Sequence, residues 1–352
     1  MRINKNQFTI TGVKENVNFH YNRGKGHLIP YIRNRFMWHY FPRLGWVSRF
    51  PDHVDVEIST LCNMKCPMCY TPTETFKSRV GKGFMAFPLF KKIISECAEY
   101  KVYSIRLSLR GEPFIHPEVL KMLAYAKGKG IKEVSALTNL LALDEEMFRE
   151  LVKLGMDWLT ISFDGLGATY EDIRKPARFK EGYGKIKKFA EIKREMNSRK
   201  PAIKIQTIWP AIKENPGEFY DTFLPYVDQI TVNPLIDYLH NDKDIVYTNG
   251  FTCHVLWQRL VIGYDGKVLL CSNDEMGKGI LGNVNFQTIN EIWHGDKMNV
   301  MRRLHREKRA YRELEVCREC HFPRKLIEKE FVIGNRTYHI KQYVNRTDEI
   351  GK

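Results

Sequence analysis

Residues 53–70 read HVDVEISTLCNMKCPMCY, and they join an alternating apolar segment to a dense group of cysteines. Apolar and polar residues alternate over 53–59, which predicts a β-strand buried on one face. Three thiols follow this strand directly, at Cys62, Cys66 and Cys69. Soft thiolates at this density favour zinc or an iron–sulfur cluster. The stretch therefore predicts a metal site at the carboxyl end of a strand.

The sequence after this stretch alternates strand and helix patterns at roughly 25-residue spacing. Strands joined by helical crossovers pair in parallel, and ligands bind beyond their carboxyl ends. The expected fold class is therefore α/β, a partial (β/α)6 TIM-like barrel with parallel strands plus a small C-terminal Cys-rich α+β domain. The predicted strands cover residues 53–59, 103–109, 134–138, 158–163, 202–208 and 229–232, and the predicted helices cover residues 87–100, 117–129, 144–154, 182–197 and 218–226.

The pattern changes in the last third of the chain, where cysteines and glycines return. Asp265-Gly266 predicts a hairpin turn there. Thr288 and Glu291 form a capping box, which predicts a helix running to about Arg306. The expected organisation is a basic, aromatic-rich lead-in, the barrel, the Cys-rich domain, and a C-terminal hairpin and tail, over residues 1–50, 51–240, 250–330 and 331–352.

Composition narrows the class of protein. The chain has 352 residues, of which 43% are hydrophobic, so it can fill a sizeable core and global disorder is excluded. No apolar run approaches the roughly 20 residues needed to cross a bilayer, so we expect a cytoplasmic protein with no membrane partner. Thiols stay reduced there, which favours metal binding over disulfides for the eight cysteines. The net charge of +15 suits either an acidic partner or a merely solvated surface.

The C-x3-C-x2-C spacing, followed by the aromatic Tyr70, resembles the radical S-adenosylmethionine (SAM) superfamily. Three thiolates leave one iron of a [4Fe–4S] cluster open, whereas tetrahedral zinc would need a fourth local ligand. The resemblance implies that Cys62, Cys66 and Cys69 hold the catalytic cluster and that SAM binds its open iron. Reductive cleavage would then give a 5′-deoxyadenosyl radical that takes a hydrogen atom from a substrate carbon. A reductase or flavodoxin-type donor would supply the electron.

A motif after the second predicted strand extends this resemblance. Arg110-Gly111-Glu112-Pro113 is similar to the superfamily's Gly-Gly-Glu-Pro segment, although Arg110 replaces the first glycine. The resemblance makes Glu112, with the backbone around Gly111, the contact for the amino group of SAM, and it places Tyr70 near the adenine. A tight turn without any ligand would also explain Gly111.

Later strand ends supply further cofactor-binding candidates. Residues 161–165, Ile-Ser-Phe-Asp-Gly, are similar to the superfamily's Ser-x-Asp-Gly segment. The resemblance makes Ser162 a contact for the methionine carboxylate, with Arg174 and Asn139 as additional candidates. Each of these could instead be a turn residue.

A second group of cysteines consists of Cys253, Cys271, Cys317 and Cys320. Its spacing is similar to the SPASM extension behind many radical SAM domains, in a shortened form with four cysteines. Four thiolates can ligate one auxiliary [4Fe–4S] cluster. Two alternatives stay open: a structural zinc site with four cysteines, and a free Cys253 that returns a hydrogen atom to the substrate in an epimerase.

Other polar residues have less specific interpretations. Asp274 is a candidate proton acceptor, although a surface position explains it as well. Cys97 lies on an apolar helical stripe and is expected in the core, and His116 is expected to cap a turn. His254 adjoins a ligand cysteine and is expected beside the cluster.

The resemblance leaves the substrate open. We expect oxidation, dehydrogenation or epimerisation of a small molecule, such as a sugar or a nucleotide-linked compound. The alternative is a maturase that modifies a side chain of a ribosomally made peptide. A third hypothesis, from another class, is a zinc-stabilised nucleic-acid-binding protein that uses the basic run at 301–309. An exposed helix face explains this run more simply, so nucleic acid is not an expected partner.

Overall fold

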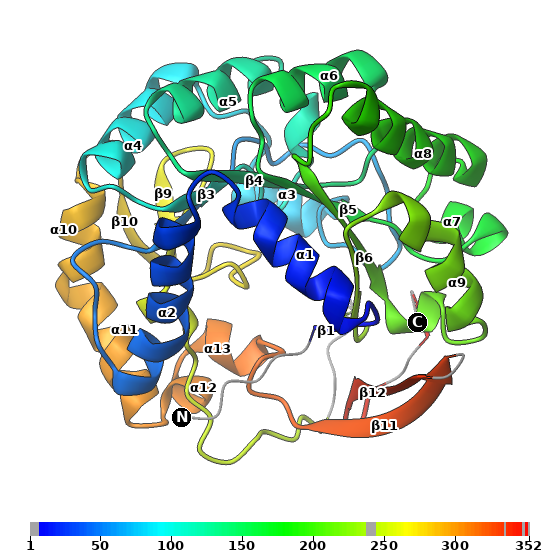
Figure 1. Ribbon diagram of the computed structural model, residues 1–352. Coiled ribbons are helices and arrows are strands. Elements are labelled where there is room, and N and C mark those ends of the chain that lie inside the picture. The colour runs from blue at the N-terminus through cyan, green and yellow to red at the C-terminus, as the bar shows by residue number, and fades with distance from the viewer. Residues whose placement is uncertain (1–6, 237–243, 334–335, 347–348, 351–352) are drawn as a thin grey trace.

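The computed structural model describes residues 7–236, 244–333, 336–346 and 349–350. One sheet contains ten strands in the order β1-β7-β6-β5-β4-β3-β2-β8-β9-β10. The strands from β2 to β7 pair in parallel and in chain order, which confirms the predicted crossovers. Figure 1 shows this sheet curving like part of a barrel. Its strands are β1 Phe8–Thr9, β2 His53–Val56, β3 Ser104–Arg106, β4 Glu133–Thr138, β5 Trp158–Ser162, β6 Ala202–Ile208, β7 Gln229–Asn233, β8 Arg259–Ile262, β9 Lys267–Leu269 and β10 Ile280–Asn283.

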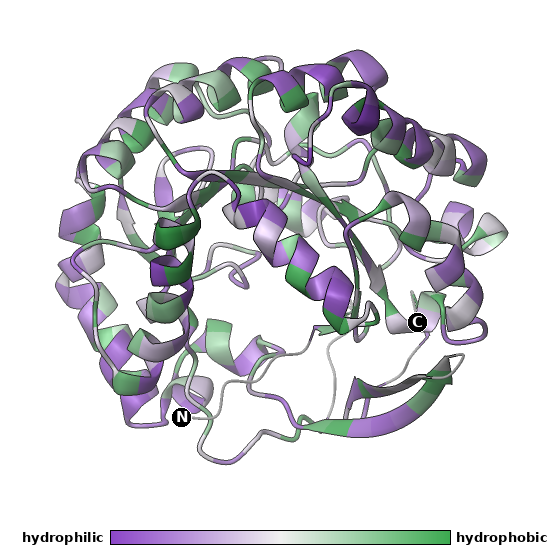
Figure 2. Cartoon of the chain, in the orientation of Figure 1, coloured by the Kyte–Doolittle hydropathy of each residue, from purple (hydrophilic) through white to green (hydrophobic). Residues whose placement is uncertain are grey.

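Helices surround the outer side of the curved sheet (Figure 1). Figure 2 shows hydrophilic stretches on these surrounding helices, most clearly on α8. None of the helices in the described part of the chain is long and apolar enough to span a membrane. The helices of the barrel region are α3 Glu74–Val80, α4 Phe87–Glu99, α5 Val119–Gly128, α6 Glu145–Lys153, α7 Gly167–Ile173, α8 Phe179–Glu195 and α9 Pro216–Phe223, and α3 and α7 were not predicted.

The two faces of the sheet differ, because successive side chains of a strand point to opposite faces. On the outer face, Val54, Ile105 and Val134 are neighbours in the register and are fully buried. On the inner face, the neighbours one residue later are Asp55 and Arg106. The apolar face therefore packs against the helices, and the polar face lines the interior of the barrel.

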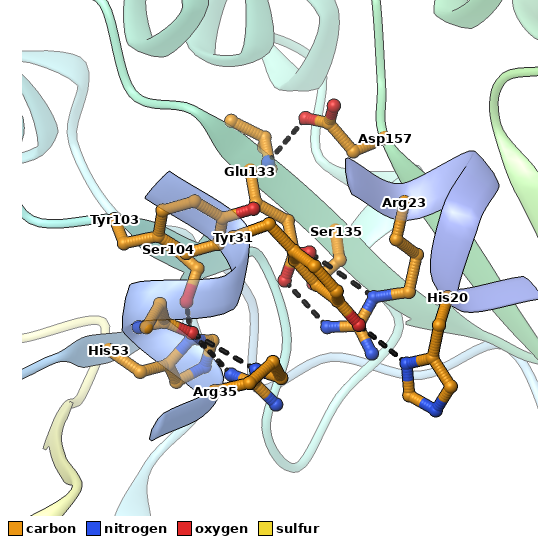
Figure 3. A network of polar contacts seen from close by, with 12 residues as sticks. His20, Arg23, Tyr31, Arg35, His53, Tyr103, Ser104, Glu133, Ser135 and Asp157 are labelled. Carbon is orange, nitrogen blue, oxygen red and sulfur yellow. Dashed lines mark hydrogen bonds and ion pairs between the residues drawn. The ribbon is translucent and has the colours of Figure 1, made fainter. Parts of the chain in front are cut away.

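Two helices that the sequence did not predict, α1 (Val13–Gly24) and α2 (Leu28–Leu44), lie across the amino ends of the strands. Arg23 forms an ion pair of 2.8 Å with Glu133 at the start of β4. Phe19 packs edge-to-face against Trp158 at the start of β5. Figure 3 shows the ion pair of Arg23 with Glu133 within a wider polar network. The lead-in is thus an arm that packs against the strands.

The Cys-rich segment continues the barrel sheet across the predicted domain boundary, because β8 pairs in parallel with β2. Asp265-Gly266 forms the predicted hairpin turn between β8 and β9, and Gly266 adopts a φ of +84° there. The capping box at Thr288 is present, but the predicted single helix is interrupted at Gly295. The remaining elements are α10 Ile289–His294, α11 Asp296–Arg306, α12 Ala310–Glu313, α13 Glu315–Glu319 and the tail hairpin β11 Leu326–Ile333 with β12 Arg336–Tyr343, which was predicted.

Candidate active site

A cavity of about 250 Å³ lies at the carboxyl ends of the barrel strands. It is lined by the loops after β2 and β3, by residues at or just beyond the ends of β4, β5, β6 and β7, and by Arg174. The nine residues that the sequence assigned to the radical cluster and to SAM all line it: Cys62, Cys66, Cys69, Tyr70, Gly111, Glu112, Asn139, Ser162 and Arg174.

The loop after β2 presents the three thiols to this cavity. Burial raises the pKa of Cys62 to about 11 and also raises the pKa of Cys66. A thiol must lose its proton to bind metal, so the site needs nearby donors that stabilise the thiolate. Asn139 Nδ2 lies 3.6 Å from Cys62 Sγ, and Arg174 Nη1 lies 3.9 Å from Cys66 Sγ. The donor set therefore fits three metal-bound thiolates.

Gly111 allows the loop after β3 to approach the cysteine loop. A Cβ atom on Gly111 would lie 2.5 Å from the carbonyl oxygens of Ser59 and Leu61. The next residue, Glu112, donates its backbone N–H to Leu61 O at 2.8 Å. The requirement for glycine is thus a close backbone contact rather than a turn conformation.

The Glu112 carboxylate joins the loop after β3 to the end of β4. It accepts hydrogen bonds from Phe114 N (3.1 Å), Thr138 Oγ1 (2.9 Å) and Asn139 N (2.7 Å). Burial raises its pKa to about 7, while these hydrogen bonds act in the opposite direction. A carboxylate has about four acceptor positions, so one remains for a donor in the cavity.

Arg110, which departs from the superfamily pattern, connects the barrel to the Cys-rich segment. Its guanidinium binds both oxygens of Glu57, just beyond β2. Its Nη1 donates to the backbone oxygen of Glu275 at 3.2 Å. The replacement of glycine by arginine therefore ties together two loops that belong to different cysteine groups.

Arg174 and Ser162, two further predicted contacts of SAM, lie beyond and at the end of β5. Arg174 is fixed by Asp164, because its Nε donates to Asp164 Oδ2 at 2.7 Å. Ser162 ends β5 and has only 8% of its surface exposed. Gln206, which pairs with Ser162 in the register, accepts a hydrogen bond from Gln7. Asn233 lines the same cavity from the end of β7.

The second cysteine group surrounds a small, largely apolar cavity. Cys253, Cys271, Cys317 and Cys320 all line it. In the described part of the chain, no three Cys, His, Asp or Glu side chains are grouped tightly enough for a single metal ion. A four-iron cluster takes one thiolate on each iron, so separated thiols around a cavity fit it.

Hydrogen-bond donors also surround these thiols. Asn273 donates its backbone N–H to Cys271 Sγ and its side-chain amide to Cys320 Sγ, each at 3.4 Å. His305 Nε2 lies 3.6 Å from Cys317 Sγ. Burial raises the pKa of Cys320 to about 12, and the Asn273 donor acts against this shift. The contact of Asn273 with Cys320 was not foreseen, because it joins residues that are 47 positions apart.

The basic run at 301–309 is mostly exposed, as expected, but two of its residues face the core. Arg302 and His305 are only 2% and 4% exposed. Together with the buried Met298, they occupy one side of α11 at positions i, i+4 and i+7. This spacing was the available signal in the sequence.

Asp274 is buried, so the surface position that we considered is wrong. Its two carboxylate oxygens accept the backbone N–H groups of Lys278 (2.7 Å) and Gly279 (2.8 Å). The carboxylate thus holds the turn that follows Cys271. A proton-accepting role for it stays a prediction.

Two of the less specific predictions are confirmed. Cys97 is fully buried in the hydrophobic core. His116 accepts the Glu118 N–H at Nδ1 and contacts Met85 O through Nε2, as expected for a residue that caps a turn. Both residues therefore contribute to packing and local structure.

Comparison with known protein families matches the two cysteine groups separately. The model of the radical SAM superfamily matches residues 56–224, and the model of the SPASM iron–sulfur cluster-binding domain matches residues 253–321. A curated relative is the tungsten-containing aldehyde ferredoxin oxidoreductase cofactor-modifying protein of Pyrococcus furiosus, 29% identical over 46% of this chain and 44% of that protein. The chain spans less than half the length of the curated relatives it matches.

Two solved structures share the fold at low sequence identity. BtrN in complex with AdoMet and 2-DOIA aligns with a TM-score of 0.55 and 18% identity, over 78% of this chain and 94% of that chain. Streptococcus suis SuiB bound to its precursor peptide SuiA aligns with a TM-score of 0.53 and 14% identity, over 82% of this chain and 73% of that chain.

Proposed function

Because this chain belongs to the radical SAM superfamily and carries a SPASM iron–sulfur cluster-binding domain, we propose that it oxidises a small substrate after hydrogen-atom abstraction from carbon. Part of this follows from the family itself: the chain is a radical SAM enzyme with SAM and [4Fe–4S] clusters as cofactors. The oxidation, the small substrate and the role of each residue are the proposal. The observation that supports it is the convergence of all nine predicted residues on one cavity.

When bound, the cluster and SAM supply one-electron cleavage of the sulfonium and a 5′-deoxyadenosyl radical that takes a hydrogen atom from the substrate. The protein binds and orients these groups. Cys62, Cys66 and Cys69 would hold the cluster. The remaining acceptor position of Glu112 suits the ammonium group of SAM, and Arg174 would keep the thiolate of Cys66 deprotonated.

Oxidation is favoured over epimerisation by the position of Cys253. An oxidation requires the substrate radical to lose one electron and one proton, so a redox group must accept the electron. An epimerisation instead requires a free donor to return a hydrogen atom. Cys253 lines the same cavity as Cys271, Cys317 and Cys320, which supports a set of four ligands rather than a free thiol.

The second candidate function is maturation of a ribosomally made peptide. The observation that favours this candidate is the fold that the chain shares with SuiB, which was solved with its precursor peptide. Transfer of deuterium from the substrate to 5′-deoxyadenosine distinguishes a small-molecule substrate from a peptide. A substrate deuterated at the reacting carbon passes deuterium to 5′-deoxyadenosine, so nucleotide-linked sugars and candidate precursor peptides can be compared directly.

The radical assignment is tested by anaerobic reconstitution with iron and sulfide, followed by incubation with SAM and dithionite. Two [4Fe–4S] clusters hold about eight irons, and 5′-deoxyadenosine should form. Cys66→Ala should abolish its formation. Cys97→Ala, which changes a core cysteine, is the matched control and should retain it. A colourless protein with bound zinc, or unchanged cleavage in Cys66→Ala, would contradict the proposal.

A further inference from the structure

Three cationic side chains lie on the inner face of the sheet, at register positions before the cofactor cavity. Arg106 comes from β3, Lys204 from β6 and Arg259 from β8. The side chain of Arg106 is 26% exposed although β3 lies between β2 and β4. Since helices cover the outer face, this exposure means that water reaches the interior of the barrel beside these cations. We call the three residues the cationic layer.

The negative charge near the cationic layer does not balance it. Asp55 contacts both guanidinium groups, with Arg106 Nε at 2.8 Å and Arg259 Nη1 at 3.3 Å. Two other carboxylates on this face have their own arginine partners: Arg23 holds Glu133 through two hydrogen bonds (Figure 3), and Arg110 holds Glu57. One carboxylate therefore serves two arginines, and Lys204 adds a third cation.

Lys204 has no carboxylate partner among the described residues. Only 8% of its surface is exposed, and its Nζ lies 5.0 Å from the centre of the Trp158 ring. Burial lowers its pKa to about 7, and the neighbouring cations Arg23 and Arg106 add to this effect. The Nε atom of Arg259 is likewise buried without a hydrogen-bond acceptor in the described structure. A buried cation without an anion is costly, so this arrangement is suited to a ligand that brings negative charge.

The register sets the distance of the cationic layer from the reaction site. Lys204 pairs with Thr160, and Thr160 is two residues before Ser162, which lines the cofactor cavity. A strand rises about 3.3 Å per residue, so Lys204 starts about 7 Å deeper in the barrel than the cavity wall. A substrate held at both positions would be a small, elongated molecule.

We propose that the cationic layer binds an anionic group of the substrate, a carboxylate or a phosphate, while the reacting carbon lies in the cavity above. This inference rests on the proposed function and names the chemical class of its substrate. Two arginines and one lysine match the charge and the acceptor geometry of either anion. A neutral sugar would leave the cationic layer without a counter-charge.

Isothermal titration calorimetry of the reconstituted enzyme tests the inference, with inorganic phosphate in one arm and acetate in the other. We expect one anion per chain to bind in at least one arm, and the arm that binds identifies the anion class. Lys204→Met should weaken this binding at least tenfold, and Lys204→Arg should preserve it because the charge is kept. Lys129→Met, at an exposed lysine, is the matched control and should bind like the wild type.

Negative results of these titrations also decide between the hypotheses. Absence of binding in both arms, or equal binding by wild type and Lys204→Met, overturns the anion site. Formation of 5′-deoxyadenosine from SAM is measured on the same wild-type sample. Anion binding without SAM cleavage contradicts the proposed function alone, and SAM cleavage without anion binding contradicts the inference alone.

Discussion

The two cysteine groups use the same ligand atom in opposite surroundings. The first group lies on one loop, presents three thiols and lines a cavity with polar residues such as Glu112 and Arg174. The second group gathers four thiols from three segments around a small, largely apolar cavity. Four thiolates would fill every iron position of a cluster, so we expect the second site to exchange electrons, whereas the first keeps one position for a ligand. The surroundings of the cysteines, rather than the cysteines alone, distinguish the two sites.

The largest expected effect comes from removing one thiol from each group. Cys66→Ala and Cys320→Ala should each lower the iron content from about eight to about four per chain. Cys66→Ala should eliminate SAM cleavage, a loss of more than a thousandfold. Cys320→Ala should instead lose substrate oxidation, because the electron of the substrate radical then lacks its acceptor. Iron analysis and separate assays of 5′-deoxyadenosine and of product measure this. Identical activity profiles of the two variants would remove the distinction between the sites.

The next largest effect concerns Asp55 on β2. Its carboxylate contacts arginines on β3 and on β8, and β8 belongs to the segment of the second cysteine group. Asp55→Asn leaves Arg106 on β3 and Arg259 on β8 without their shared counter-charge. Breaking such a buried pair costs about 3–5 kcal/mol, so the free energy of unfolding in urea should fall by this amount. Glu118→Gln, which breaks an exposed ion pair with Lys121, should cost less than about 1 kcal/mol.

The ion pairs of Asp55 with Arg106 and Arg259 also predict how the free energy of unfolding depends on pH. Burial acts to raise the pKa of Asp55, but Arg106, His53 and Arg259 outweigh it and hold the pKa well below its usual range. A carboxylate with a depressed folded pKa contributes stability above its unfolded pKa of about 3.9 and loses it as the pH falls through the folded value. The difference in unfolding free energy between wild type and Asp55→Asn should be constant from pH 8 to pH 5 and shrink below about pH 4. A difference that shrinks near neutral pH would contradict this assignment.

A smaller effect tests the close contact at the first group. Gly111→Ala places a Cβ against the carbonyl oxygens of Ser59 and Leu61, which should cost about 1–3 kcal/mol and lower iron loading at Cys62, Cys66 and Cys69. Gly184→Ala is the matched control. No atom lies within 4 Å of its added Cβ, and it lies inside α8, so it should stabilise the chain by up to about 1 kcal/mol. Equal effects on thermal unfolding would contradict the close contact.

The smallest effect tests the donors around the second group. A donor to a cluster thiolate stabilises the reduced, more negative state. His305→Phe should therefore lower the midpoint potential of the auxiliary cluster by about 20–60 mV, equivalent to one hydrogen bond of about 0.5–1.5 kcal/mol. The titration uses the Cys66→Ala background, so that only the auxiliary cluster contributes to the electron paramagnetic resonance signal. His294→Phe, at an exposed position on α10, should leave the potential unchanged. A rise in potential on His305→Phe would reverse the assigned role.

The sheet of the barrel was predictable because its apolar residues follow the strand period. Val54 and Val56 alternate with Asp55, and the structure buries the valines against the helices. The helix α2 was not predictable for the opposite reason. Its outward side carries Ile29 and Phe36, which are 83% and 55% exposed, whereas polar residues such as Asn34 are buried. Both the buried and the exposed side of α2 mix polar and apolar residues, so its sequence gives no amphipathic signal.

The residues of the candidate site likewise fall into those that the sequence could identify and those that it could not. Residues within local motifs, such as Cys66 and Glu112, could be named from sequence because one loop contains the whole signal. Residues that act through partners far along the chain could not. Arg110 contacts a loop near position 275, and Lys204 acquires its unusual environment only when β6 is placed beside β5. Register and long-range pairing are properties of the folded sheet, and short motifs do not contain them.

The pairing of β8 with β2 has a consequence for synthesis of the chain on the ribosome. The strand β2 is the first of the parallel set to be made, but its second neighbour, β8, follows about 200 residues later. At translation rates of about 5–20 residues per second, one edge of β2 stays without its partner for about 10–40 s. An unpaired strand edge is a template for association with other chains. During that interval the unpaired edge of β2 lies only a few residues before the first three cysteines of the nascent chain, until Arg259–Ile262 emerges.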